Sequence, residues 1–95
     1  MAGMWIAHID VKDDEAYADY VKGSSEVIPR YDGVFIARGG RYRQMEGKER
    51  RRNVVITFPT YDRAVECYES DEYQAIVSQA VDAADRTLVI VETDD

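Results

Sequence analysis

Two adjacent glycines flanked by arginines are the most specific chemical feature of the sequence. Arg38-Gly39-Gly40-Arg41 follows a strand-like apolar run, residues 34–37. A phosphate-binding loop needs such glycines to run into the N-terminus of a helix. Here Arg, Tyr and Arg continue a strand-like run, so the glycines favour a β-bulge or a close backbone approach. A bulge can turn Arg38 towards a cavity, so we predict that Arg38, Gly39 and Gly40 help to bind a small carboxylate or phosphate ligand.

His8 is the only histidine and lies in the middle of a strand-like segment, Met4 to Val11. The ordinary interpretation is a core histidine with one hydrogen bond. The functional alternative makes His8 the candidate catalytic residue, a general base in a pocket between the sheet and the helices. That alternative rests on analogy with related folds, which is a weaker argument than geometry.

Two further side chains are candidate ligand-binding residues, Tyr73 and Glu92. Tyr73 lies on the apolar stripe of a predicted helix, where a core tyrosine finds a partner for its hydroxyl. Glu92 ends the last predicted strand and would pair with His8 or with an arginine if the register allowed it, which the sequence does not fix. Cys67 is expected to be a buried, unreactive thiol.

The sequence predicts no bound cofactor and no metal. One cysteine and one histidine exclude an internal disulfide and any zinc site built on several such ligands. The chain carries no haem or flavin signature and no nucleotide-binding motif.

Charge is distributed very unevenly along the 95 residues. The net charge is −7, but residues 38–52 alone carry +5 and the remaining 80 residues carry −12. A negative total argues against general nucleic-acid binding. No apolar run approaches the roughly 18 residues that a membrane span needs, and no signal peptide precedes the first strand, so we expect a cytoplasmic protein. The basic turn, Lys48 to Arg52, is expected to be solvated surface, or else to contact acidic helices of a second subunit.

The order of apolar patterns predicts one α+β domain over residues 1–95. Each helix has a polar N-cap, and Gly33 is expected to end the first helix in a left-handed conformation. Strand 34–46, broken at the two glycines, should pair with strand 53–58 as a hairpin. The order is β-α-β-β-α-β with the second helix split at Ser70, a ferredoxin-like unit with a four-stranded antiparallel sheet and both helices on one face. The predicted strands cover residues 4–11, 34–46, 53–58 and 87–93, and the helices follow Asp14 and Thr60.

The first, third and last predicted strands are apolar on both faces, although helices cover only one face of such a sheet. A continuous apolar face is rarely left in water. Packing that face against a second copy would give a symmetric homodimer, which is the partner we predict.

The chain also resembles the small bacterial proteins of domain of unknown function 1330, in the dimeric α/β-barrel superfamily. The resemblance implies the same fold and a dimer whose two sheets pack together, but it implies no reaction. Three positions depart from the family pattern: Cys67 replaces an aromatic residue, Asp71 a proline and Ala80 an arginine. The residues that carry the resemblance are Trp5-Ile6-Ala7, Ala16-Tyr17-x-x-Tyr20, Ala37-Arg38-Gly39-Gly40, Glu46-Gly47, Val54-Val55-Ile56-Thr57-Phe58-Pro59, Tyr68-x-Ser70-x-Glu72-Tyr73-Gln74 and Leu88-Val89-Ile90-Val91-Glu92.

Two functional hypotheses follow. The first is a homodimeric small-molecule-binding protein whose pocket lies between the sheet and the split second helix, with Arg38 as the anion anchor. It extends to a cofactor-independent enzyme acting on a small anionic or carbonyl compound, with His8 transferring the proton. The alternative is a non-catalytic assembly module, in which Trp5, Phe35, Phe58 and the tyrosines fill the space between helices and sheet and leave no pocket.

Overall fold

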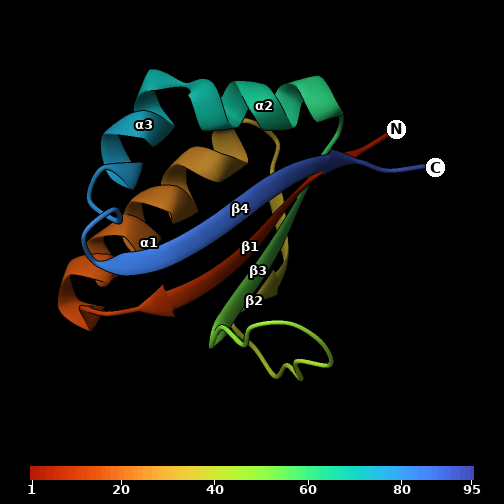
Figure 1. Ribbon diagram of the computed structural model, residues 1–95. Coiled ribbons are helices and arrows are strands. Elements are labelled where there is room, and N and C mark those ends of the chain that lie inside the picture. The colour runs from red at the N-terminus through yellow and green to blue at the C-terminus, as the bar shows by residue number, and fades with distance from the viewer.

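The fold is a four-stranded antiparallel sheet with all three helices on one face. The computed structural model describes residues 1–95, and the strands lie in the order β2-β3-β1-β4 (Figure 1). This arrangement confirms the predicted ferredoxin-like fold, with the second helix in two pieces. None of the helices has the length and the apolar character to cross a membrane. The elements are β1 (Gly3–Val11), α1 (Asp14–Arg30), β2 (Val34–Arg38), β3 (Arg52–Phe58), α2 (Tyr61–Glu69), α3 (Asp71–Val77) and β4 (Ala84–Glu92).

Helix α1 begins where predicted, but the left-handed residue that follows it is not the one predicted. The Asp13 side chain caps it by accepting a hydrogen bond from the backbone N–H of Ala16. The left-handed residue after the helix is Asp32, with φ of 67°, and not Gly33 as predicted. Gly33 is small for another reason: a Cβ there would lie 2.5 Å from Ile28 and 2.8 Å from Phe58.

The second helix is broken at Ser70, as the sequence predicted. Ser70 closes α2 through its backbone and caps α3 by accepting a hydrogen bond from the N–H of Tyr73. The break directs Cys67 and Tyr73 into the core, where both are fully buried. Burial raises the pKa of the Cys67 thiol to about 12, so this thiol stays protonated and unreactive near neutral pH.

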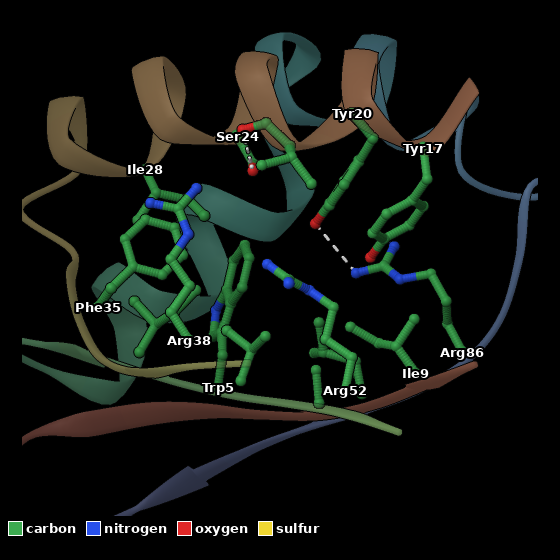
Figure 2. Close-up of a pocket in the computed structure, with 15 residues that line it drawn as sticks. Trp5, Ile9, Tyr17, Tyr20, Ser24, Ile28, Phe35, Arg38, Arg52 and Arg86 are labelled. Carbon is green, nitrogen blue, oxygen red and sulfur yellow. Dashed lines mark hydrogen bonds between the residues drawn. The ribbon is translucent and has the colours of Figure 1, made fainter. Parts of the chain in front are cut away.

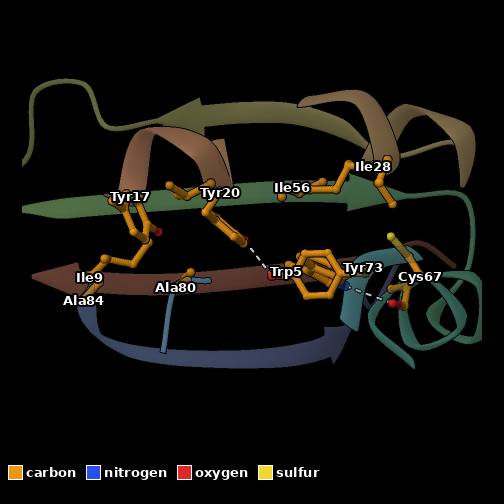
Figure 3. Close-up of a cluster of buried hydrophobic side chains, with 14 of the residues drawn as sticks. Trp5, Ile9, Tyr17, Tyr20, Ile28, Ile56, Cys67, Tyr73, Ala80 and Ala84 are labelled. Carbon is orange, nitrogen blue, oxygen red and sulfur yellow. Dashed lines mark hydrogen bonds between the residues drawn. The ribbon is translucent and has the colours of Figure 1, made fainter. Parts of the chain in front are cut away.

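Aromatic rings fill the space between the sheet and helices α2 and α3. The Trp5 ring packs edge-on against Tyr73, with centroids 4.9 Å apart, and its indole N–H donates to the carbonyl of Ala64 (Figure 3). Tyr68 also meets Trp5 at 5.8 Å. Sequence reasoning predicted a ligand pocket beside this split helix, and that position is wrong because the rings occupy the space.

Strand β2 is shorter than predicted, and the expected hairpin does not extend through the glycines. It ends at Arg38, and β3 begins only at Arg52, so residues 39–51 form an irregular loop. Gly39 leaves the sheet with φ of 71° while its N–H still donates to the carbonyl of Asn53. Continued pairing would have set the arginines of this segment on neighbouring strands, where like charges repel each other.

The irregularity in β2 lies at Ile36 and not at the two glycines. Phe35 pairs with Ile56 and Ala37 with Val55, so Ile36 is an extra residue without a partner. One extra residue reverses the faces of everything after it. Phe35 and Arg38 therefore point to the same, helix-covered side of the sheet. A bulge does turn Arg38 inward, but it lies at Ile36, three to four residues before the glycines at which it was predicted.

The two faces of the sheet differ sharply in exposure. The face towards the helices holds the core, including Trp5 at 1% exposed and Ile56 at 4%. On the opposite face Val34 and Val89 are 57% and 49% exposed. That opposite face, which we call the outer face, carries a further row of apolar side chains from the two central strands and β4: Met4, Ile6, Val55 and Val91.

Candidate functional site

A narrow cavity lies between the inner face of the sheet and helix α1 (Figure 2). The space that the centre of a water molecule can reach inside is about 20 Å³, enough for one water. Arg38 is exposed, so the cavity reaches the surface beside it. Its lining is Trp5, Ala7, Ile9, Tyr17, Tyr20, Val21, Ser24, Ile28, Phe35, Arg38, Arg52, Val54, Ile56, Arg86 and Leu88.

Three arginines from three different strands converge on this cavity. Arg52 of β3 and Arg86 of β4 both pair with Ile9 of β1, from its two sides. Residues that pair directly across an antiparallel sheet share a face, so both arginines point inward with Ile9. The bulge at Ile36 brings Arg38 of β2 to the same side. In Figure 2 the three side chains reach up from the sheet towards α1.

None of these three arginines has a carboxylate partner within 4.0 Å. Every ion pair in the chain uses Arg30, Lys48, Arg50 or Arg63. A cation in a partly desolvated site costs free energy unless an anion or several acceptors compensate it. The lining of the cavity therefore carries an excess of positive charge, and the protein supplies no counter-ion for it.

The protein gives the three guanidinium groups only neutral contacts. Arg38 donates to the hydroxyl of Ser25 and lies over the ring of Phe35, 3.9 Å from its centroid. Arg86 donates to the hydroxyl of Tyr20 at 3.0 Å and lies 4.5 Å over the same ring. Its Nε is buried and has no hydrogen-bond partner. The side chain of Arg52 makes no hydrogen bond, and its guanidinium packs against Gly39, where a Cβ would lie 2.6 Å from Nη1.

Two tyrosines extend the site into the core. The hydroxyls of Tyr20 and Tyr73 are 2.6 Å apart. Burial raises the pKa of Tyr20, and the nearby Tyr73 adds to this effect while Arg86 opposes it. Burial also raises the pKa of Tyr17 and of Tyr73. All three phenols are therefore neutral hydrogen-bonding groups at physiological pH.

The structure separates the predicted site residues into two groups. Arg38 lines the cavity and Tyr73 reaches it through Tyr20. Gly39 and Gly40 do not line it, although Gly39 leaves the room that the Arg52 guanidinium occupies. Their roles in ligand binding stay predictions.

His8 and Glu92 lie elsewhere. His8 points to the outer face, where its Nδ1 is 2.6 Å from Oδ1 of Asn53. It neighbours Gln44, Lys48 and Arg50 of the irregular loop. Glu92 pairs with Gly3 at the far end of the sheet, whereas His8 pairs with Thr87. The structure therefore brings together neither His8 with Arg38 nor Glu92 with either of them.

Sequence reasoning missed two of the three arginines. Arg52 was assigned to a basic surface turn, but it is the first residue of β3 and alternates with the buried Val54, Ile56 and Phe58. Arg86 was omitted because the last strand was expected to begin at Thr87, whereas β4 begins at Ala84. The signal in both cases was period-two alternation, which places each arginine on the apolar inner side of its strand. Lys48 and Arg50, by contrast, pair with Asp85 on the surface of their own chain.

Comparison with known proteins gives a match to a family of unknown function and structural likenesses to proteins that include an oxygenase. The family model described as "Domain of unknown function (DUF1330)" matches residues 2–94. No curated protein matches the sequence. A protein of unknown function from Rhodopseudomonas palustris superposes with a TM-score of 0.78 at 18% identity, covering 99% of this chain and 83% of that one.

Two other solved structures extend the comparison. A dimeric ferredoxin-like protein of unknown function from Jannaschia sp. gives a TM-score of 0.73 at 11% identity, covering 98% of this chain and all of that one. SnoaB, a cofactor-independent oxygenase from Streptomyces nogalater, gives 0.66 at 9% identity, covering 99% and 94%. At such low identities these likenesses show a shared fold and nothing about chemistry.

Proposed function

Because the chain belongs to the DUF1330 family, whose description names no reaction, we propose a function from the cavity itself: the protein is a homodimer that binds a small organic anion beneath α1. The observation that carries this proposal is the convergence of Arg38, Arg52 and Arg86 without any carboxylate. An arginine fork matches the two oxygens of a carboxylate, and such charge-assisted bonds are the strong ones.

The rest of the lining defines the body of the ligand. Apart from the arginines and Ser24, every lining side chain is aliphatic or aromatic. Such a surface favours an apolar group attached to the anion, since burial of apolar area supplies most of the affinity in small pockets. The ligand class is therefore an apolar or aromatic compound with one anionic end.

Ligand entry requires a side chain to move, because the present space holds about one water. Arg38 is the side chain best placed to do so. It is exposed, and only Ser25 and the Phe35 ring hold it. We expect the ligand to replace the Ser25 hydroxyl as the partner of Arg38.

We base the proposal of a homodimer on the exposed apolar side chains of the outer face. Val34 and Val89 leave large apolar surface in contact with water, and the helices cannot cover it because they lie on the other side. A second copy offers the same surface in return, which is how symmetric dimers form. Several solved structures with this fold are described as dimeric, which supports the proposal.

Binding, rather than proton transfer by the protein, is the function that the cavity supports best. Its lining contains no His, Asp, Glu, Lys or Cys, and burial raises the pKa of the two tyrosines that line it, Tyr17 and Tyr20, so both keep their protons near neutral pH. General acid–base catalysis needs a group that exchanges a proton near the working pH within hydrogen-bond reach of the substrate. A catalytic role for His8 stays a prediction and would require a substrate at the outer face.

Calorimetric titration with sodium benzoate, and separately with inorganic phosphate, tests this proposal. Wild type should bind benzoate, and Arg86→Met should weaken binding about tenfold or more, because a charge-assisted hydrogen bond is worth roughly 1.5–3 kcal/mol. Arg43→Met is the matched control, since Arg43 lies exposed in the loop and makes no side-chain contact with an acid. Absence of benzoate binding to wild type, or equal binding by Arg86→Met, would contradict the proposal.

A further inference from the structure

Two tyrosine hydroxyls share one short hydrogen bond deep in the site, and its direction has consequences for the ligand. Tyr20 and Tyr73 lie 2.6 Å apart, oxygen to oxygen. Each hydroxyl has one hydrogen to donate and two lone pairs to accept with. Only one of the two hydrogens can lie between the two oxygens.

Burial decides which hydroxyl donates. Tyr73 is 0% exposed and does not line the cavity. No backbone carbonyl or other acceptor besides Tyr20 lies within hydrogen-bond distance of its hydroxyl. If Tyr20 donated to Tyr73, the Tyr73 hydrogen would be buried without an acceptor, which is unfavourable. Tyr73 therefore donates and Tyr20 accepts.

Tyr20 is then saturated as an acceptor and free as a donor. Its oxygen accepts one hydrogen from Tyr73 and a second from Arg86 Nη2 at 3.0 Å. Its own hydrogen has no acceptor in the protein, and Tyr20 lines the cavity. Arg86 Nε is a second buried donor without an acceptor. The part of the cavity between Tyr20 and Arg86 thus holds two donors without an acceptor in the protein.

We infer that the part of the cavity between Tyr20 and Arg86 is a carboxylate-binding site. Tyr20 is the residue whose hydroxyl makes this site prefer a carboxylate over a neutral group of similar shape. The inference rests on the proposed function and names its ligand class more narrowly. A carboxylate carries only acceptors and can take hydrogen bonds from Tyr20 and Arg86 with different lone pairs.

The same donors reject close relatives of a carboxylate. A carboxylate can place one oxygen on the Tyr20 hydroxyl and the other on the Arg86 guanidinium. A primary amide in the same position would turn its NH2 hydrogens towards one of these two donors and leave that donor without an acceptor. A site built for one hydrogen-bonding pattern discriminates strongly against an isostere that leaves buried groups unpaired. Inorganic phosphate offers acceptors but no apolar body for the lining of Ile28, Phe35 and Leu88.

The test compares benzoate and benzamide on wild type, Tyr20→Phe, Tyr73→Phe and Tyr61→Phe. Wild type should prefer benzoate by at least about tenfold. Tyr20→Phe should weaken benzoate about tenfold and bring its affinity close to that of benzamide. Tyr73→Phe should weaken it less, because the Tyr20 hydrogen stays available. Tyr61→Phe, at an exposed position on α2, should match wild type.

A second measurement does not depend on the tyrosine variants folding. The Nε–H resonance of Arg86 in wild type should shift downfield as benzoate is added and should shift less with benzamide, because a charged carboxylate is a stronger acceptor for that proton than a neutral amide carbonyl. Equal benzoate affinity in wild type and Tyr20→Phe, or an unmoved Arg86 resonance at saturating benzoate, would overturn the inference.

The two proposals fail in different ways. If wild type binds no benzoate, the proposed function fails and this inference fails with it. If wild type binds benzoate and Arg86→Met loses it, but Tyr73→Phe weakens binding as much as Tyr20→Phe, the anion site stands and the assignment of the Tyr20 hydrogen is wrong.

Discussion

Two arginines on the inner face of the sheet and two on the helix surfaces differ in whether the protein supplies a carboxylate partner. Arg30 and Arg63 lie on exposed helices, and each has a carboxylate within 3.3 Å. Arg52 and Arg86 lie against an apolar cavity, and neither has one. The chain has 19 acidic residues and a net charge of −7, so a shortage of carboxylates is not the cause. An unpaired cation costs more free energy beside this cavity than at the surface, which is the reason we propose that a ligand anion completes the site.

The largest effect is expected from a charge on the outer face, which would break the contrast between the two faces of the sheet. Ile6→Lys places a cation in the middle of the proposed dimer interface, where an unpaired charge costs several kcal/mol. We expect the dimer dissociation constant to rise by about 100-fold or more, seen by light scattering on a dilution series. Glu15→Lys, at an exposed position of α1, is the control, because it introduces a lysine away from the outer face. A dimer that survives Ile6→Lys would place the interface elsewhere.

A carboxylate introduced between the inner arginines should act as an internal ligand. Ile9 pairs with both Arg52 and Arg86, whereas Ile56 pairs with Trp5 and Phe35. Both side chains are buried, so Ile9→Glu and Ile56→Glu lose similar apolar packing. Only the first gains two guanidinium partners, so it should unfold about 10 °C higher than the second and lose benzoate binding. Equal melting temperatures would show that the protein already compensates the positive charges of Arg52 and Arg86, so that an added carboxylate stabilises nothing.

The smallest effect concerns pH. Burial raises the pKa of Tyr20 above its ordinary value of 10.0, so its hydroxyl keeps the proton that we assign to the ligand. Benzoate affinity should therefore stay within about twofold between pH 7 and 9. Because the unfolded chain ionises its tyrosines near pH 10 while folded Tyr20 does not, stability from this group is present below pH 10 and is lost as the pH rises further. A Tyr20→Phe variant should lose less stability between pH 10 and 11 than wild type, measured by urea unfolding.

The fold could be predicted from the sequence because the features that indicate helices and strands are local and recur along the chain. Capping side chains at Asp13, Thr60 and Ser70 mark where helices begin, and each accepts the expected backbone hydrogen bond. The end of β2 was harder to predict. Its bulge at Ile36 lacks the glycine that sequence reasoning relied on, and the glycines instead form the exit from the sheet.

The site was predicted only in part, for a physical reason. Arg38 stood out because of its glycine neighbours, but which face it occupies depends on the bulge. Arg86 and Arg52 meet only through their shared partner Ile9, and strand register is a tertiary property that one sequence does not reveal. His8 drew attention because histidine is the usual proton-transfer residue, yet its place on β1 puts it on the other face.

The most direct measurement is a crystal structure of the protein grown with benzoate. We expect a carboxylate against Arg86 Nε and the Tyr20 hydroxyl, with the benzoate ring towards Phe35 and Leu88 and with Arg38 moved away from Ser25. An empty cavity at saturating benzoate, or benzoate bound at the outer face beside His8, would contradict it.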